Sequence, residues 1–188
     1  MNEEQRESAI SELNYSEAPK MVTDFPGPKS REIFNEGMAL ESPQRACGLA
    51  WPIVVEEGRG AGLKDVDGNI LIDGCSGIAV SSCGHNHPRV VKAIQDQAAK
   101  FGHGFDLTSP LKVQLLRKIV ETAPAGLKNE SFVTLGMSGT AAAEIAVKQA
   151  KMITGRSQIC AFEGAYHGVF GTAQAMTTGP RYRKKYGP

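Results

Sequence analysis

The stretch VTLGMSGTAAAEIAVKQA, residues 133–150, runs from a short apolar segment through a glycine-rich turn into a run of small residues. This order predicts a strand over 131–135 and a helix over 139–154. A further apolar run predicts a strand over 158–162. A strand, a helix and a strand joined by short turns indicate a parallel βαβ unit, and therefore an α/β fold. One such unit is too little sheet to cover two helix layers, so we expect an incomplete sheet.

The turn at Ser138, Gly139 and Thr140 is a candidate anion site. The first amides of a helix have no intrahelical acceptor, and the helix dipole adds positive potential there. Gly139 allows a close backbone approach, and the two hydroxyls can donate hydrogen bonds. The stretch has neither the lysine of a GxxxxGK[ST] loop nor a GxGxxG pattern, which disfavours a nucleoside triphosphate or a dinucleotide. Taken alone, it leaves a bound phosphate and a plain strand-to-helix turn equally open.

A second candidate site follows the next predicted strand, in FEGAYHG at residues 162–168. Ligands of open parallel sheets bind at the carboxyl ends of the strands. Tyr166 could stack on a flat ring, with His167 beside it; an ordinary half-buried tyrosine and a loop histidine are the alternative. A phosphate site and a ring site at consecutive strand ends together indicate pyridoxal phosphate.

The chain before this unit is predicted to form an arm, a hairpin and helices. We expect a helix over 30–39, and helices that begin at Pro88 and after Ser109, each with proline in the first turn. Strands are expected over 52–56, 61–66 and 70–73, with a hairpin turn at Asp67-Gly68-Asn69. The expected division is a flexible arm (1–30), a segment with the hairpin and a helix (31–105), and the start of an incomplete cofactor domain (106–188).

Composition narrows the class of protein. Of the 188 residues, 41% are hydrophobic and 22% charged, which is ordinary for a soluble globular chain. The net charge of +1 gives no electrostatic case for nucleic acid or an anionic membrane. The N-terminus is polar and acidic, unlike a signal peptide, and no apolar run could span a bilayer. Cysteines without paired spacing (Cys47, Cys75, Cys83 and Cys160) indicate reduced, packed thiols and a cytoplasmic location.

Two metal-like patterns are interpreted otherwise. Asp65, Asp67 and Asn69 resemble the start of a calcium loop, but the glycine comes too early, so we predict a hairpin turn. The sequence GHNHP, at 84–88, has no C-x₂₋₄-C pair beside it and is better interpreted as a turn that caps the next helix. No metal site is predicted.

Three longer stretches resemble one family: residues 57–101, SGTAAAEIAVKQA at 138–150, and AFEGAYHG at 161–168. They are similar to the class III aminotransferases, the pyridoxal-phosphate group that includes 4-aminobutyrate, ornithine and acetylornithine aminotransferases. PGPKSRE at 26–32 and the closing YGP resemble the 4-aminobutyrate branch in particular. The resemblance covers roughly residues 24–188, with the motifs in the family order.

The resemblance implies a partial fold-type I transferase that binds pyridoxal 5′-phosphate. Ser138, Gly139 and Thr140 would form the phosphate cradle. Tyr166 would stack on the pyridine ring with His167 beside it, and Ile78 would lie next to the substrate. The family works as a homodimer and moves an amino group from an amine or ω-amino acid to a 2-oxo acid.

Other positions qualify this assignment. Glu144 matches a recurrent acidic position, for which a supporting role and a surface pair with Lys148 are both open, the pair being favoured. Family members that clamp a second carboxylate carry an arginine where this chain has Val169, so 4-aminobutyrate itself is a doubtful substrate. Ala141 replaces the usual acidic residue after the cradle.

The catalytic lysine is not found in a family-like context, and we expect it downstream of residue 188. The chain is therefore predicted to be an N-terminal portion of the enzyme, inactive in transamination alone and prone to aggregate. The alternatives are a catalytically inactive binding or interaction protein that kept the fold, and a truncated gene product.

Overall fold

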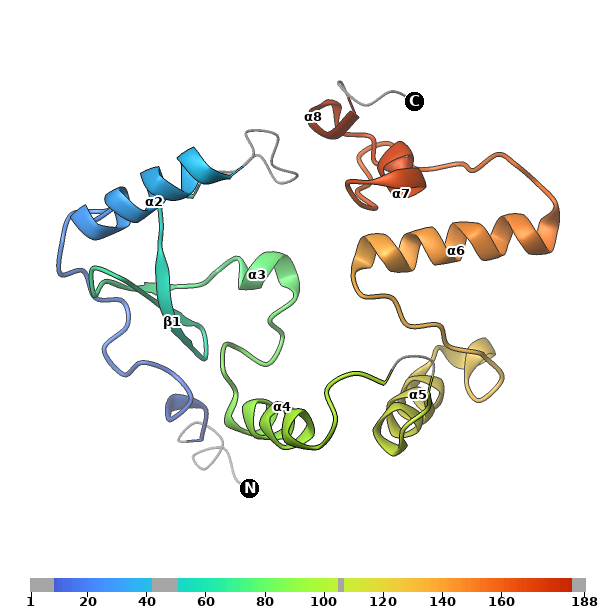
Figure 1. The fold of residues 1–188 in the computed structure, drawn as a ribbon, viewed down its shortest axis with the longest axis horizontal. Coiled ribbons are helices and arrows are strands. Elements are labelled where there is room, and N and C mark those ends of the chain that lie inside the picture. Colours follow the sequence, from blue (N-terminus) through green and yellow to red (C-terminus); the bar gives the residue numbers. More distant parts are fainter. Residues whose placement is uncertain (1–8, 42–50, 105–106, 184–188) are drawn as a thin grey trace. The chain divides into compact units, whose positions relative to one another are not determined.

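The computed structural model describes residues 9–41, 51–104 and 107–183, whose elements are drawn in Figure 1. The chain divides into two compact units, Met1–His103 and Gly104–Pro188, and each is described by itself. Within the described residues, no helix is both long enough and apolar enough to cross a membrane.

The first unit is built on an antiparallel sheet of β1 (Val55–Arg59), β2 (Gly62–Asp65) and β3 (Ile70–Ile72), in that order. The predicted hairpin turn between β2 and β3 is confirmed, with Gly68 at a φ of 89° that glycine adopts without strain. The strand predicted over 52–56 lies further along the chain, because β1 pairs with β2 through Gly58 and Arg59.

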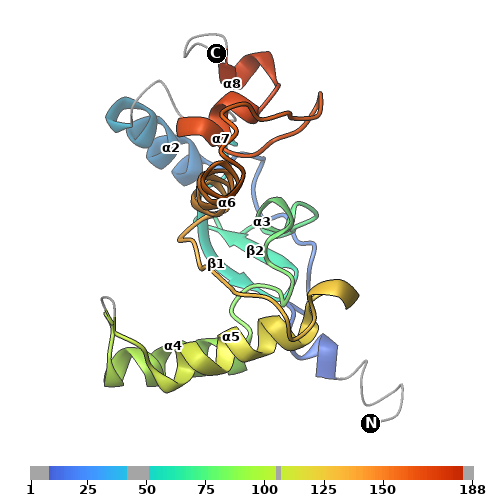
Figure 2. The ribbon, with the colours of Figure 1, turned by 90° about the vertical axis from the view of Figure 1, so that its right-hand side faces the viewer.

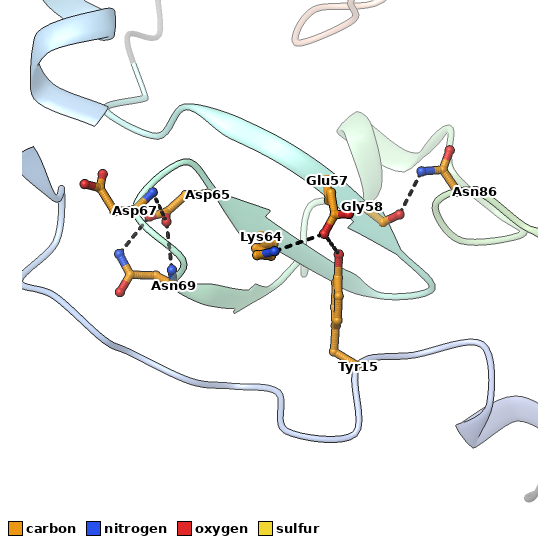
Figure 3. A network of polar contacts seen from close by, with 8 residues as sticks. All are labelled: Tyr15, Glu57, Gly58, Lys64, Asp65, Asp67, Asn69 and Asn86. Carbon is orange, nitrogen blue, oxygen red and sulfur yellow. Dashed lines mark hydrogen bonds and ion pairs between the residues drawn. The ribbon is translucent and has the colours of Figure 1, made fainter. Parts of the chain in front are cut away.

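The segment before the first long helix is bound to this sheet. Lys20 and Ile70 exchange backbone hydrogen bonds of 2.9 and 2.7 Å. The buried Asn69 accepts from the amides of Val22 and Thr23 through Oδ1, at 2.8 and 3.0 Å. Further out, the Tyr15 hydroxyl donates to Glu57, as Figure 3 shows. Residues 15–23 therefore follow the hairpin closely.

Helix α2 (Pro28–Leu40) takes its N-terminal cap from the hairpin turn. Its own N-cap residue, Gly27, has no side chain to offer. The Asp67 carboxylate accepts instead from the amides of Lys29 and Ser30, at 2.9 and 2.8 Å. A Cβ built on Gly27 would lie 2.3 Å from Asp67 Cγ, so the glycine leaves room for this carboxylate. Partial desolvation opposes ionisation of Asp67, but the hydrogen bonds from Ser30 and Lys29 outweigh it and lower its pKa.

The remaining helices of the first unit are α3 (Ser76–Ala79) and α4 (Pro88–Lys100). The predicted capping turn before α4 is confirmed, because His87 is its N-cap and accepts from the Arg89 amide at 3.2 Å. The second unit contains α5 (Pro110–Thr122), η1 (Ala125–Leu127), α6 (Gly139–Thr154), α7 (Gly171–Met176) and α8 (Pro180–Arg183). Helix α7 packs on α6, and α8 on α7 (Figure 2).

The two strands predicted around α6 are wrong for this chain. Neither 131–135 nor 158–162 is in a β-ladder in the described part of the second unit, so the parallel βαβ pairing is not formed. A strand exists only through hydrogen bonds to a neighbour, and one phenylalanine in each segment is almost fully exposed, Phe132 at 104% and Phe162 at 89%. Buried apolar side chains are few among the described residues: Ile70, Val147 and Ala173.

Candidate functional site

The predicted cradle lies at the start of α6, a helix of 16 residues. Ser138 is the N-cap, and its Oγ accepts from the Ala141 amide at 3.1 Å, which leaves its hydroxyl hydrogen free to donate. The amides of Gly139 and Thr140 precede any intrahelical acceptor. A Cβ added to Gly139 would meet no atom within 4 Å, so the backbone there is open to an approaching group. The cradle can therefore offer amide and hydroxyl donors together.

Gly136 fixes the chain that leads into the cradle. A Cβ at this position would lie 2.8 Å from the Ala142 backbone nitrogen, closer than any side chain tolerates. The segment before Ser138 consequently lies directly against the first turn of the helix.

The Tyr166-His167 turn is bounded by two glycines with positive φ, Gly164 at 82° and Gly168 at 150°. The Tyr166 ring is 58% exposed and meets the Tyr182 ring edge-on, with the centroids 5.1 Å apart. His167 is also exposed, whereas Gly168 is buried. The two predicted ring-binding side chains are thus accessible from a turn with a defined backbone.

The structure brings this turn to the cradle. A Cβ on Gly168 would fall 2.5 Å from Cγ2 and Oγ1 of Thr140, so the glycine backbone lies against that side chain. Segments 28 residues apart in sequence therefore meet, although the strands expected to place them are not formed in the described residues; the shared site itself stays a prediction.

Two residues that support the turn were assigned otherwise or missed. Thr177 is 1% exposed, and its Oγ1 accepts from the amides of His167 and Gly168 at 2.9 and 3.1 Å. Its position after an apolar run gave no signal of this role. The Glu144 carboxylate accepts from the Ala173 amide at 2.6 Å and so caps α7. The favoured pair with Lys148 is not found among the ion pairs of the described residues, so that interpretation of Glu144 is wrong.

Ile78, predicted to lie beside the substrate, is in the first unit at 70% exposure. It belongs to a left-handed turn in which φ is positive at four successive residues: 52° at Ser76, 61° at Gly77, and 63° at Ile78 and Ala79. Non-glycine residues enter this region at a cost of about 1–2 kcal/mol each. Such strain persists only where the surrounding structure holds the backbone in place.

Asp73 holds the start of this turn. Its carboxylate accepts from the amides of Cys75 and Ser76 at 3.0 and 2.7 Å, and lies 2.7 Å from Nε2 of His85. The hydrogen bond to His85, with the two amides, lowers the pKa of Asp73 despite partial desolvation.

The described cysteines lie at the surface. Cys75, Cys83 and Cys160 are free thiols and are exposed, so the expectation of packed thiols is wrong for these three; Cys47 lies outside the described residues. No group of three histidine, cysteine, aspartate or glutamate side chains within the described ranges could hold a metal ion.

Comparison with known proteins shows the family of this chain. The family profile described as "Aminotransferase class-III" matches residues 46–188. A 4-aminobutyrate aminotransferase from Mycobacterium tuberculosis is 36% identical over 172 residues, 90% of this chain and 37% of that protein. An alanine/serine racemase from Pyrococcus horikoshii is also 36% identical, over 84% of this chain and 33% of that protein. The chain thus spans about a third of the length of these curated relatives.

Solved structures show the same fold. A transaminase from the marine bacterium Virgibacillus aligns with a TM-score of 0.70 at 24% identity, over 84% of this chain and 38% of that one. An (S)-enantioselective omega-transaminase from Thermomicrobium roseum also has a TM-score of 0.70, at 25% identity, over 84% and 37%. The predicted fold class, an α/β chain corresponding to part of a transaminase, is confirmed by these neighbours. With a family profile that matches more than half of its length, the chain belongs to the class III aminotransferase family.

Proposed function

We propose that this chain supplies the phosphate-binding side of a pyridoxal-phosphate aminotransferase that moves an amino group from an ω-amino acid or amine to a 2-oxo acid. Family membership supports the reaction class, since the relatives include 4-aminobutyrate and diaminobutyrate aminotransferases. The observation that carries the proposal for this site is the contact between Gly168 and Thr140, which joins the cradle to the Tyr166-His167 turn.

The residues present fit a phosphate ester. The amides of Gly139 and Thr140 and the hydroxyls of Ser138 and Thr140 would donate to its oxygens, and the dipole of α6 favours its negative charge. No Cβ at Gly139 obstructs the approach. Tyr166 would lie on the face of the attached ring, and His167 would flank it. When bound, pyridoxal phosphate supplies an electron-withdrawing ring that stabilises negative charge on the substrate carbon.

The finer parts of the proposal concern the whole enzyme. We propose a cytoplasmic homodimer in which Ile78 contacts the substrate. Val169 has no charge with which to bind a second carboxylate, which favours amines or less acidic amino acids as donors. No lysine of this chain is assigned here to covalent attachment of the cofactor, so the proposal for residues 138–168 concerns binding of the phosphate and the ring.

A second candidate is amino-acid racemisation, which the same cofactor can support. The relative from Pyrococcus horikoshii named as an alanine/serine racemase favours it, because it is as similar to this chain as the 4-aminobutyrate aminotransferase is. Racemisation needs no amino acceptor. Formation of D-alanine from L-alanine by the whole enzyme without any 2-oxo acid would favour this candidate over transamination.

The cradle can be tested on the chain itself with pyridoxine 5′-phosphate, which has no aldehyde and cannot attach to surface lysines. We expect a ³¹P NMR titration to show saturable binding of pyridoxine 5′-phosphate. An excess of pyridoxine, which has no phosphate, should not displace it. Ser138→Asp retains a capping carboxylate but repels phosphate, so it should keep α6 and abolish binding. Ser109→Ala is the matched control, because Ser109 caps α5 in the same way, accepting from the Lys112 amide at 3.2 Å.

Two results would contradict this assignment. One is displacement of bound pyridoxine 5′-phosphate by pyridoxine as readily as by unlabelled pyridoxine 5′-phosphate, which would mean that the phosphate adds nothing to binding. The other is unchanged affinity in Ser138→Asp, which would place the phosphate somewhere other than the start of α6.

A further inference from the structure

The residues of the Tyr166-His167 turn do little to fix its backbone conformation by themselves. Glycines with positive φ bound it, and both functional side chains point from it while largely exposed. A turn of this kind samples many conformations unless its backbone groups are bound from outside. The described structure shows what binds them.

Two consecutive threonines hold the backbone of the turn. Thr177 Oγ1 accepts from the amides of His167 and Gly168, and lies 2.8 Å from the Gly168 carbonyl oxygen, to which it can donate. Thr178 Oγ1 accepts from the Gly164 amide at 2.7 Å, and the Thr178 amide donates to the Ala165 carbonyl at 3.1 Å. The turn is therefore tied from its first glycine to its last by residues 177 and 178.

Helix α7 places these threonines. Thr177 is its C-cap and donates its amide to the carbonyls of Ala173 and Gln174, at 3.2 and 3.0 Å. A helix of six residues is too short to be stable alone and depends on outside contacts. Its own N-cap, Phe170, has no capping side chain, so the first turn depends on Glu144 of α6.

Glu144 is carried by the cradle helix. Its Oε1 accepts from the Ala173 amide, and a Cβ on Gly171 would fall 2.6 Å from the same oxygen, so glycine makes room for the carboxylate. A continuous connection thus runs from the cradle along α6 to Glu144, through α7 to Thr177, and back to the turn. The Gly168–Thr140 contact closes this loop at the cradle.

We propose that Glu144 and Thr177 are positioning residues of the cofactor site, which hold the Tyr166-His167 turn over the cradle through α7. This rests on the proposed function, since the turn is assigned to the ring of the cofactor. Neither residue touches the cofactor in this assignment. Their effect is on the ring, and the phosphate donors at the start of α6 do not depend on them.

The test compares two probes that differ in the ring. Inorganic phosphate reports the cradle alone, and pyridoxine 5′-phosphate reports the cradle together with the turn. We expect Glu144→Ala and Thr177→Val to weaken pyridoxine 5′-phosphate roughly fivefold, the scale of one lost cap, while the affinity for inorganic phosphate stays within twofold. Glu144→Gln and Thr177→Ser keep an acceptor oxygen and should restore most of the affinity. Lys148→Ala, on the next turn of α6, is the control.

Amide hydrogen exchange gives a readout that needs no ligand. In Glu144→Ala we expect faster exchange at His167 and Gly168, which Glu144 does not contact, as well as at Ala173. Unchanged exchange at His167 and Gly168 with faster exchange only at Ala173 would overturn the proposal, since Glu144 would then stabilise α7 alone. An equal loss of affinity for inorganic phosphate and for pyridoxine 5′-phosphate in Glu144→Ala and Thr177→Val would overturn it too. If the unmodified chain binds neither probe while exchange at His167 and Gly168 still responds to Glu144→Ala, the proposed function fails. The positioning of the turn by Glu144 through α7 is then supported without it.

Discussion

The Asp73 carboxylate lies 2.7 Å from Nε2 of His85, and this pair spans the left-handed turn that carries Ile78. His85 is itself fixed to the sheet, because it exchanges backbone hydrogen bonds of 3.0 and 2.7 Å with Gly60. Asp73 follows β3 directly. Both ends of the strained segment are therefore anchored on the hairpin, which explains how successive residues persist at positive φ.

This pair predicts that the attachment of the left-handed turn to the sheet weakens in acid. Because the folded-state pKa of Asp73 is lowered, its stabilising contribution is present above the ordinary value of 3.8 and is lost as the pH falls through the lower folded value. We expect the exchange protection of the Gly60 and His85 amides to fall in that acid range. Asp73→Asn should show low protection at neutral pH and no such acid dependence.

Asp96→Asn is the control for the Asp73 experiment, since Asp96 lies on α4 and forms an exposed pair with Lys92, away from the left-handed turn. An identical pH profile in the unmodified chain and in Asp73→Asn would show that another carboxylate controls this anchor.

A second prediction concerns the cap that the hairpin gives to α2. Asp67→Ala removes the acceptor for the Lys29 and Ser30 amides, and Gly27 has no side chain to replace it. We expect those two amides to exchange roughly fivefold faster, the effect of losing one cap, with less helix signal in circular dichroism. Asp67→Asn keeps one acceptor oxygen, so its exchange rates at Lys29 and Ser30 should lie between those of the unmodified chain and of Asp67→Ala. No change at Ser30 in Asp67→Ala would contradict the capping role.

A third prediction concerns the buried Asn69, which joins the N-terminal segment to the hairpin and whose hydrogen bonds to Asp65 are drawn in Figure 3. Its Oδ1 accepts from the amides of Val22 and Thr23, and its Nδ2 donates to Asp65 at 2.8 Å. Asn69→Ala would leave the buried Asp65 carboxylate with one partner fewer. We expect the free energy that holds the N-terminal segment on the hairpin to fall by about 1–3 kcal/mol. The loss would be seen as rapid proteolysis between residues 9 and 25.

Asn86→Ala is the matched change for Asn69→Ala. Asn86 is exposed and its side chain donates one hydrogen bond, to the Gly58 carbonyl at 2.8 Å, so its loss should leave the proteolysis rate nearly unchanged. Equal rates of cleavage in the two variants would contradict the anchoring role of Asn69.

The sequence predicted those features that depend on neighbours in the chain. Helix α6 has the predicted bounds, and Ser109 and His87 cap the helices that follow them, because cap and turn preferences act over three or four residues. The caps from Asp67 and Glu144 were not predicted, since each reaches a helix 37 or 29 residues away. No local pattern encodes such a partner. The strands at 131–135 and 158–162 were predicted from apolar runs, but a run specifies a strand only where a neighbouring strand is present to pair with it.

The last prediction tests the contact that joins the two halves of the cofactor site. Gly168→Ala would place a methyl group 2.5 Å from Thr140 atoms, at a φ of 150° that L-residues rarely adopt. Gly164→Ala shares the positive φ, at 82°, but meets no atom within 4 Å, so it separates backbone strain from collision. We expect Gly168→Ala to weaken pyridoxine 5′-phosphate at least fivefold more than Gly164→Ala does, because only the former moves the Tyr166-His167 turn away from the cradle. Equal losses in the two variants would mean that strain in the turn, and not its contact with Thr140, sets the affinity for the ring.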